Sequence, residues 1–250
     1  MRLAHSLLLT TALVASALAA STLTMPAMAQ PATLATTMAS LPPALRAAVQ
    51  TGNGAAVQQA IQTLSAGNIQ RQGELATAVV QAAEQLLATN PQAAVNAAGA
   101  ALEIVRVTAV QTGAPQQTET VVTTAARIFI NPAAIQVAPT QVAGLAGTAV
   151  AVAQATGNPT VAASVASQAV SVAEQVVATN PAAAVQLAAT AVQAVQSSTV
   201  QNAAPAQSMA VATGAARIVV QPAAQQASPT LSATVATGVT QVVSNPTVYQ

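Results

Sequence analysis

The sequence predicts an all-α protein in which antiparallel helices, rich in Ala and Val, form a repeated array or bundle. First, Ala-Glu-Gln-Leu-Leu-Ala-Thr-Asn-Pro at 83–91 returns as Ala-Glu-Gln-Val-Val-Ala-Thr-Asn-Pro at 173–181, an offset of 90 residues. Second, Asn-Pro, Gly-Asn and Ala-Pro pairs recur along the chain. Third, apolar residues between these pairs follow helical spacing, as at Val161, Val165 and Val172. These patterns predict helices of similar length that pack side by side.

Residues 1–29 are predicted to be a secretory signal peptide. They combine a cationic start at Arg2, an apolar run over 6–20 and an Ala-Met-Ala cleavage motif at 27–29. The apolar run is shorter than the roughly 20 residues that span a bilayer, which argues against a membrane helix. Residues 30–40 are Thr-rich and show no periodicity, so we expect them to be a flexible leader.

Residues 41–250 are predicted to be the helical repeat domain. The same offset of 90 relates the segment 123–128 to 213–218, and it aligns Pro115, Pro132 and Pro139 with Pro205, Pro222 and Pro229. These matches indicate a tandem duplication. It divides into units at about 42–131 and 132–221, with a partial third at 222–250.

The helix boundaries are predicted from the recurring Asn-Pro, Gly-Asn and Ala-Pro pairs. Proline suits the first position of a helix, Asn before it can cap the free amides, and the residue before Pro is pushed out of the helical region. Each pair should thus end one helix and start the next. In chain order we expect helices at 42–51, 54–66, 69–88, 91–112, 115–130, 139–156, 159–179, 181–200, 205–220 and 229–243, with short turns of helix at 132–138 and 222–227. Under a β-solenoid alternative, any short extended stretch would fall at 127–130 and 217–220.

Two other folds are compatible with parts of the sequence. The Val and Thr content leaves a β-solenoid as an alternative, but strict alternation is rare and the segments are too long for ordinary strands. Several segments also have the length and small residues of packed membrane helices. However, Glu84, Arg106 and Glu174 lie inside three of them, beside Gln, Asn and Thr, so membrane association is the less favoured interpretation.

The charge content excludes some partners. Residues 30–250 contain five Arg and five Glu, with no Lys, Asp, His or Cys. A nucleic-acid binder needs several clustered basic contacts, so this class is excluded. A chain without Cys is held by packing alone, which fits a bacterial periplasm or cell surface better than a disulfide-stapled secreted module. A net charge of zero from so few charges favours self-association or a protein partner.

The sequence predicts no catalytic, cofactor-binding or metal-binding residues, and no small-molecule ligand is evident. Without His, Cys and Asp, nucleophilic triads, zinc sites and calcium loops lack their groups. The repeated carboxylates Glu84 and Glu174 are expected on exposed helix surfaces about one repeat apart, too separated for a glycosidase pair. The repeated Arg127 and Arg217 are expected near helix ends, where they face free carbonyls and the negative end of the helix dipole.

We therefore expect an exported, non-catalytic protein with a structural, scaffold or self-assembling role in the bacterial cell envelope or surface. The helices resemble α-solenoids in general, but the residue signatures of named helical repeats are missing, so the resemblance implies no function. One alternative is a surface-active binder of ice, polysaccharide or an apolar interface through a repeated Ala/Thr/Val/Gln face. Others are a small-residue membrane-associated protein and an enzyme with an unusual Glu/Arg/Ser/Thr site.

Overall fold

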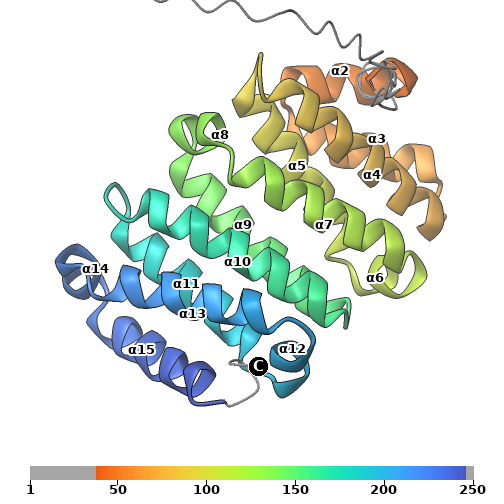
Figure 1. Ribbon diagram of the computed structural model, residues 1–250. Helices are drawn as coiled ribbons and strands as arrows, with labels where there is room; N and C mark the ends of the chain where they lie inside the picture. Colours follow the sequence, from red (N-terminus) through yellow and green to blue (C-terminus); the bar gives the residue numbers. More distant parts are fainter. Residues whose placement is uncertain (1–37, 246–250) are drawn as a thin grey trace, which may run out of the picture. The chain divides into compact units, whose positions relative to one another are not determined.

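The computed structural model describes residues 38–245, which belong to one compact unit and contain helices and short connections but no strand (Figure 1). The β-solenoid alternative is therefore wrong for this part of the chain. The predicted signal peptide at 1–29 and residues 30–37 of the predicted leader lie outside the described residues. Residues 38–40 are helical, and Arg46 donates hydrogen bonds to the carbonyls of Ala39 and Leu41.

The helices follow one another with very short connections. They are α2 (Pro43–Thr51), α3 (Gly54–Ser65), α4 (Ile69–Leu86), α5 (Pro91–Val105), α6 (Thr108–Gly113), α7 (Pro115–Phe129), α8 (Pro132–Val137), α9 (Pro139–Ala155), α10 (Pro159–Val176), α11 (Pro181–Val195), α12 (Ser198–Ala203), α13 (Pro205–Val219), α14 (Pro222–Ala227) and α15 (Pro229–Val243).

Asparagine caps explain many of these helix starts. The side-chain oxygen of Asn90 accepts a hydrogen bond from the Ala93 amide at 3.1 Å, and Asn180 does the same for Ala183 at 3.1 Å. In both places Pro occupies the first helical position, where its missing N–H has no cost. Asn53, Asn68, Asn131 and Asn158 cap their helices in the same way. The predicted meaning of the Asn-Pro pairs is confirmed.

Two predicted helices are each divided in two. The segment predicted as 91–112 is α5 and α6, and the segment predicted as 181–200 is α11 and α12. Each division falls at a residue with extended backbone, Val107 (φ −68°, ψ 124°) and Ser197 (φ −69°, ψ 137°). Ser197 accepts a hydrogen bond from the Val200 amide, whereas Val107 offers no side-chain cap. The first break therefore depends on packing rather than on a capping residue.

The helices predicted at 115–130 and 205–220 are confirmed to within one residue, and no extended stretch occurs at 127–130 or 217–220. Residues up to Phe129 belong to α7 and residues up to Val219 belong to α13. Ile128 and Ile218 are fully buried in these helices. Helical geometry turns each isoleucine toward the core, and this burial outweighs the β-propensity of the branched side chain.

The helices form two layers (Figure 1). One layer contains α4, α7, α10 and α13, which contact one another in that order, and the other contains α5, α9, α11 and α15. Each helix of the first layer packs on one of the second, giving the pairs α4/α5, α7/α9, α10/α11 and α13/α15. The helices α2 and α3 pack on α4 and α5 at the N-terminal end of the layers.

The core between the layers is made mostly of Ala and Val. Phe129 is the one aromatic side chain among the buried residues, at 0% exposure. Small side chains let helices approach closely: a Cβ added at Gly99 of α5 would lie 2.9 Å from Leu145 Cδ1 of α9. The apolar residues of the sequence thus form this core. No helix within residues 38–245 is long and apolar enough to cross a membrane.

Candidate functional site

The repeated charges pair with each other across neighbouring helices. Arg127 Nη2 on α7 lies 3.2 Å from Glu84 Oε2 on α4, and Arg217 Nη1 on α13 lies 3.6 Å from Glu174 Oε1 on α10. Both arginines occupy the last turn of their helix, as predicted. The sequence predicted Glu84 and Glu174 on exposed helix surfaces, but their side chains are only 31% and 35% exposed and each pairs with an arginine of the neighbouring helix. The spacing of 43 residues between Glu and Arg, the same in both places, was the signal for these pairs.

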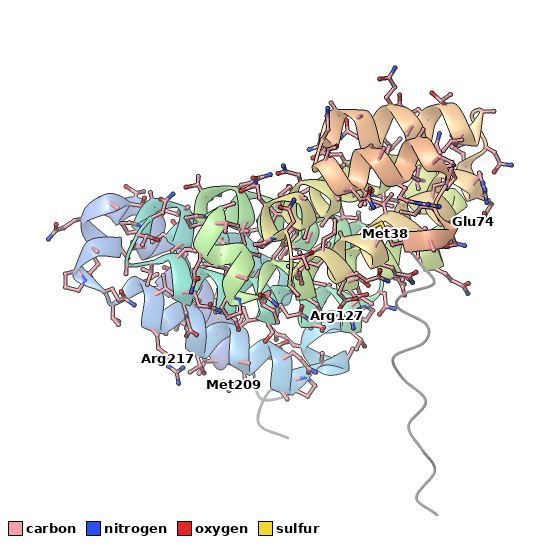
Figure 2. The ribbon with its side chains drawn as sticks, turned by 90° about the horizontal axis from the view of Figure 1, so that it is seen from above. Met38, Glu74, Arg127, Met209 and Arg217 are labelled. Carbon is pink, nitrogen blue, oxygen red and sulfur yellow. The ribbon has the colours of Figure 1, made fainter. Side chains whose placement is uncertain are left out.

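These pairs are surface features. The side chains of Arg127 and Arg217 are 58% and 71% exposed, and those of Glu84 and Glu174 are 31% and 35% exposed. Figure 2 shows Arg127 and Arg217 at the surface. Ion pairs this exposed typically contribute about 0–1 kcal/mol, because water screens them and two long side chains lose freedom. They link adjacent helices of one layer without dominating the stability of the fold.

Glu84 and Glu174 do not share a cleft. They lie on α4 and α10, and α7 packs between these two helices. The two carboxylates are thus separated by a helix, which is the arrangement that the sequence predicted for positions one repeat apart.

The remaining charged side chains also have partners inside the fold. Arg71 pairs with Glu74, and Arg106 pairs with Glu103, each at 3.0 Å along one helix surface. Glu119 accepts a hydrogen bond from Asn158 Nδ2 at 3.1 Å. Together with Arg46 and the two pairs between helices, all ten charged side chains of residues 38–245 form an ion pair or a hydrogen bond within the protein, although Glu174 Oε1 accepts no hydrogen bond and meets Arg217 only as an ion pair.

A polar hollow lies between α7 and α10 and has a volume of about 560 Å³. It is lined by Gln116, Glu119, Thr120, Thr123, Thr124, Arg127, Val161 and Gln168. The Thr120 and Thr123 hydroxyls donate to backbone carbonyls of their own helix at 2.9 Å and 2.8 Å. The Arg127 guanidinium donates to Thr124 Oγ1 at 3.3 Å as well as to Glu84.

Most polar groups of this hollow therefore have partners already. They still offer oxygen lone pairs, among them Gln168 Oε1, and the amide N–H donors of Gln116 to a neutral polar molecule. The lining contains no nucleophile bonded to a base. In the part of the chain that the structure describes, no group of three His, Cys, Asp or Glu side chains is placed to hold a metal ion.

A second hollow, between α13 and α15, is apolar. It has a volume of about 390 Å³ and is lined by Ala212, Thr213, Ala216, Arg217, Val220, Val239 and Val243. Sequence reasoning missed it, because Ala and Val at helical spacing predict a buried face, and only the packing shows which faces have neighbours.

Comparison of the chain with protein-family models, with curated proteins and with solved structures found no match. The function must therefore be argued from the residues and their arrangement.

Proposed function

We propose that this protein is an exported, non-catalytic helical array that acts as a structural, scaffold or self-assembling component of the bacterial cell envelope or surface. The observation behind the proposal is the use of its charges. All ten charged side chains of residues 38–245 bond to the fold itself, and four of them link adjacent helices of one layer. Enzymes and ion-binding proteins instead gather such groups at one site.

The proposal includes two tandem units and a partial third. Its support is that helix limits recur at the offset of 90 residues seen in the sequence: α4, α5, α6, α7 and α8 have the same lengths as α10, α11, α12, α13 and α14. The starts of α9 and α15 also differ by 90 residues. Side-by-side stacking of such units would bury the apolar face of each against its neighbour, as in repeat proteins.

Export is supported by the sequence of residues 1–29, with its cationic start, apolar run and cleavage motif. A surface with few charges and no net charge favours contact with proteins over contact with polyanions.

The test combines localisation and assembly. The full chain is expressed in a bacterial host with a C-terminal tag, and the mature chain (residues 30–250) is studied by sedimentation velocity over a wide concentration range. We expect cleavage after Ala29, recovery outside the cytoplasm, and concentration-dependent assembly. A chain kept uncleaved in the cytoplasm, or one that stays monomeric at every concentration, would contradict the proposal.

A second candidate function is supported by a row of threonines. Thr230, Thr234 and Thr237 are exposed on α15 at helical spacing, and the last two donate to carbonyls four residues earlier. Such a row suits contact with ice or a polysaccharide. The test is inhibition of ice recrystallisation, and pull-down by insoluble polysaccharides, for the mature chain and for Thr234→Lys with Thr237→Lys. Thr120→Lys on α7 is the control, and equal activity in all three would exclude this surface.

A further inference from the structure

We propose that the outer face of α13 and α15 binds the same face of a second copy of this chain, giving a two-fold dimer. This inference rests on the proposed function and its tandem units, and it names the surface through which self-association takes place.

The interior of the fold shows how such a face is normally covered. Ala126 and Phe129 of α7, with Ala146 of α9, line one small closed space together with Val165, Gln168, Ala169 and Val172 of α10. Ala126, Phe129 and Ala146 are at most 4% exposed. The pair α7/α9 is thus sealed by the next helix pair, through small apolar contacts.

The equivalent face of α13 and α15 has no such cover within residues 38–245. Ala216, Val219 and Ala236 lie 90 residues after Ala126, Phe129 and Ala146; Val219 is 7% exposed, Ala216 is partly exposed and Ala236 is exposed. Beside Ala216, Val220 is 67% exposed, and the apolar hollow between the two helices opens here. Apolar surface gathered in one place, rather than scattered singly, typically marks an interaction site.

The chemistry of the occupant follows from the interior contact. What covers α7 and α9 is a helix that presents Val165, Ala169 and Val172. The occupant of the α13/α15 face should likewise present Ala and Val from helices that approach closely. The face of a second copy offers Ala and Val at Ala216, Val220, Val239 and Val243, beside Thr213 and Arg217.

The other end of the layers does not offer a similar open face. Leu75, Val79 and Ala82 of α4 lie 90 residues before the covering residues of α10, and all three are at most 4% exposed. The helices α2 and α3 pack on α4 at this end. Head-to-tail assembly would need an uncovered α4 face on the next copy, and that face is covered. Two copies are therefore expected to pair through like faces, which gives a closed two-fold dimer.

Charge and size set the strength of the contact. Arg217 is the one charged residue between 175 and 245, so the partner face brings no opposite charge and the dimer depends on apolar burial. Two helices of 15 residues cover about 22 Å by 20 Å. Burial on both copies then totals on the order of 1,000 Å², the low end for specific interfaces, so a dissociation constant in the micromolar range is expected.

The test measures the dimer constant of the mature chain by sedimentation velocity. We expect the wild type to form dimers, and Ala236→Glu to raise the dissociation constant at least tenfold, because it places a carboxylate in an apolar contact. The control Ala151→Glu adds the same charge at an exposed position of α9 and should stay within twofold of wild type. Circular dichroism checks that each variant is folded. Raising NaCl from 0.05 to 1 M should not weaken the dimer.

A cross-link provides the second measurement, since the chain contains no Cys. Val220→Cys should be captured as a covalent dimer by a short bismaleimide, whereas Ala151→Cys should not. The inference fails if the wild type assembles, Ala236→Glu assembles equally well and Val220→Cys gives no covalent dimer. The proposed function would then remain, with self-association through another surface. If the wild type is monomeric at every concentration, both fail.

Discussion

At the scale of single residues, Gly214 decides how closely α13 approaches α10. A Cβ added there would overlap Val170 Cγ1 and contact the Glu174 carboxylate. The residue 90 positions earlier, Thr124, carries a full side chain that is 3% exposed and bonds to Arg127. The contacts α4/α7 and α10/α13 therefore differ in detail although their sequences correspond.

Gly214→Ala should destabilise the mature chain by about 1–3 kcal/mol, because Val170 must move to admit the methyl group. Gly144→Ala in α9 is the matched control: a Cβ there meets no atom within 4 Å, so the better helix propensity of Ala should add about 0.5–1 kcal/mol. Urea unfolding followed by circular dichroism measures both. Two changes of the same sign would contradict this account of the helix contact.

Residue-level prediction from the sequence worked for position but not for partners. The last-turn placement of Arg127 and Arg217 follows from local spacing, and the structure agrees. Their bonds to Glu84 and Glu174 depend on which helices are neighbours, and local periodicity has no such information. The hollow at Val220 was missed for the same reason.

At the scale of helices, each Asn-Pro joint both ends one helix and begins the next. Asn180 ends the turn after α10 by donating its amide N–H to the Val176 carbonyl at 2.7 Å, and its side chain caps α11. Pro181 then starts the helix at no hydrogen-bond cost. One dipeptide thus sets the reversal between two antiparallel helices.

Asn180→Ala should lower the free energy of unfolding by about 1 kcal/mol, since it removes the cap on the Ala183 amide. The bond from Asn180 Nδ2 to Thr140 Oγ1 is lost as well. Asn180→Ser should retain most of the stability, because a serine hydroxyl can accept the same amide hydrogen bond. Chemical denaturation of the three proteins checks this, and equal losses in both variants would show that capping is not the cause.

Most helix limits could be predicted from these joints, and two could not. The sequence lacks Pro and Gly at 106–107 and at 196–197, where α5 and α11 end. Hydrophobic periodicity continues through both places, so a single helix was expected. The short helices α6 and α12 lead from α5 and α11 to α7 and α13 of the other layer. Ser197 caps α12, whereas the break before α6 has no side-chain cap and depends on packing.

At the scale of the whole described region, each helix pair contacts only its neighbours in the layers. Stability in such an arrangement is close to a sum of local terms and interface terms. A pair with neighbours on both sides should then be held more firmly than the pair α13/α15, whose outer face is open among residues 38–245.

Val152 and Val242 test this, because they lie 90 residues apart and are at most 1% exposed. Each Val→Ala substitution should lower the local free energy of unfolding of its own helix by about 2 kcal/mol. Under native conditions, Val152→Ala should weaken hydrogen-exchange protection throughout α7 to α11, whereas Val242→Ala should weaken it mainly in α14 and α15. Similar spread from both sites would mean that the fold opens as one unit instead.

The sequence by itself determined the all-helical class, the positions of most helices and the absence of the usual catalytic groups from residues 30–250. These follow from local chemistry: proline geometry, asparagine caps, helical spacing and composition. Only the tertiary structure decided which helices are neighbours, and hence the pairs Glu84 with Arg127 and Glu174 with Arg217, the uncapped break after α5, and the open face at Val220. Ala-rich helices offer several faces of nearly equal hydrophobicity, so close packing, not pattern, selects the contacts.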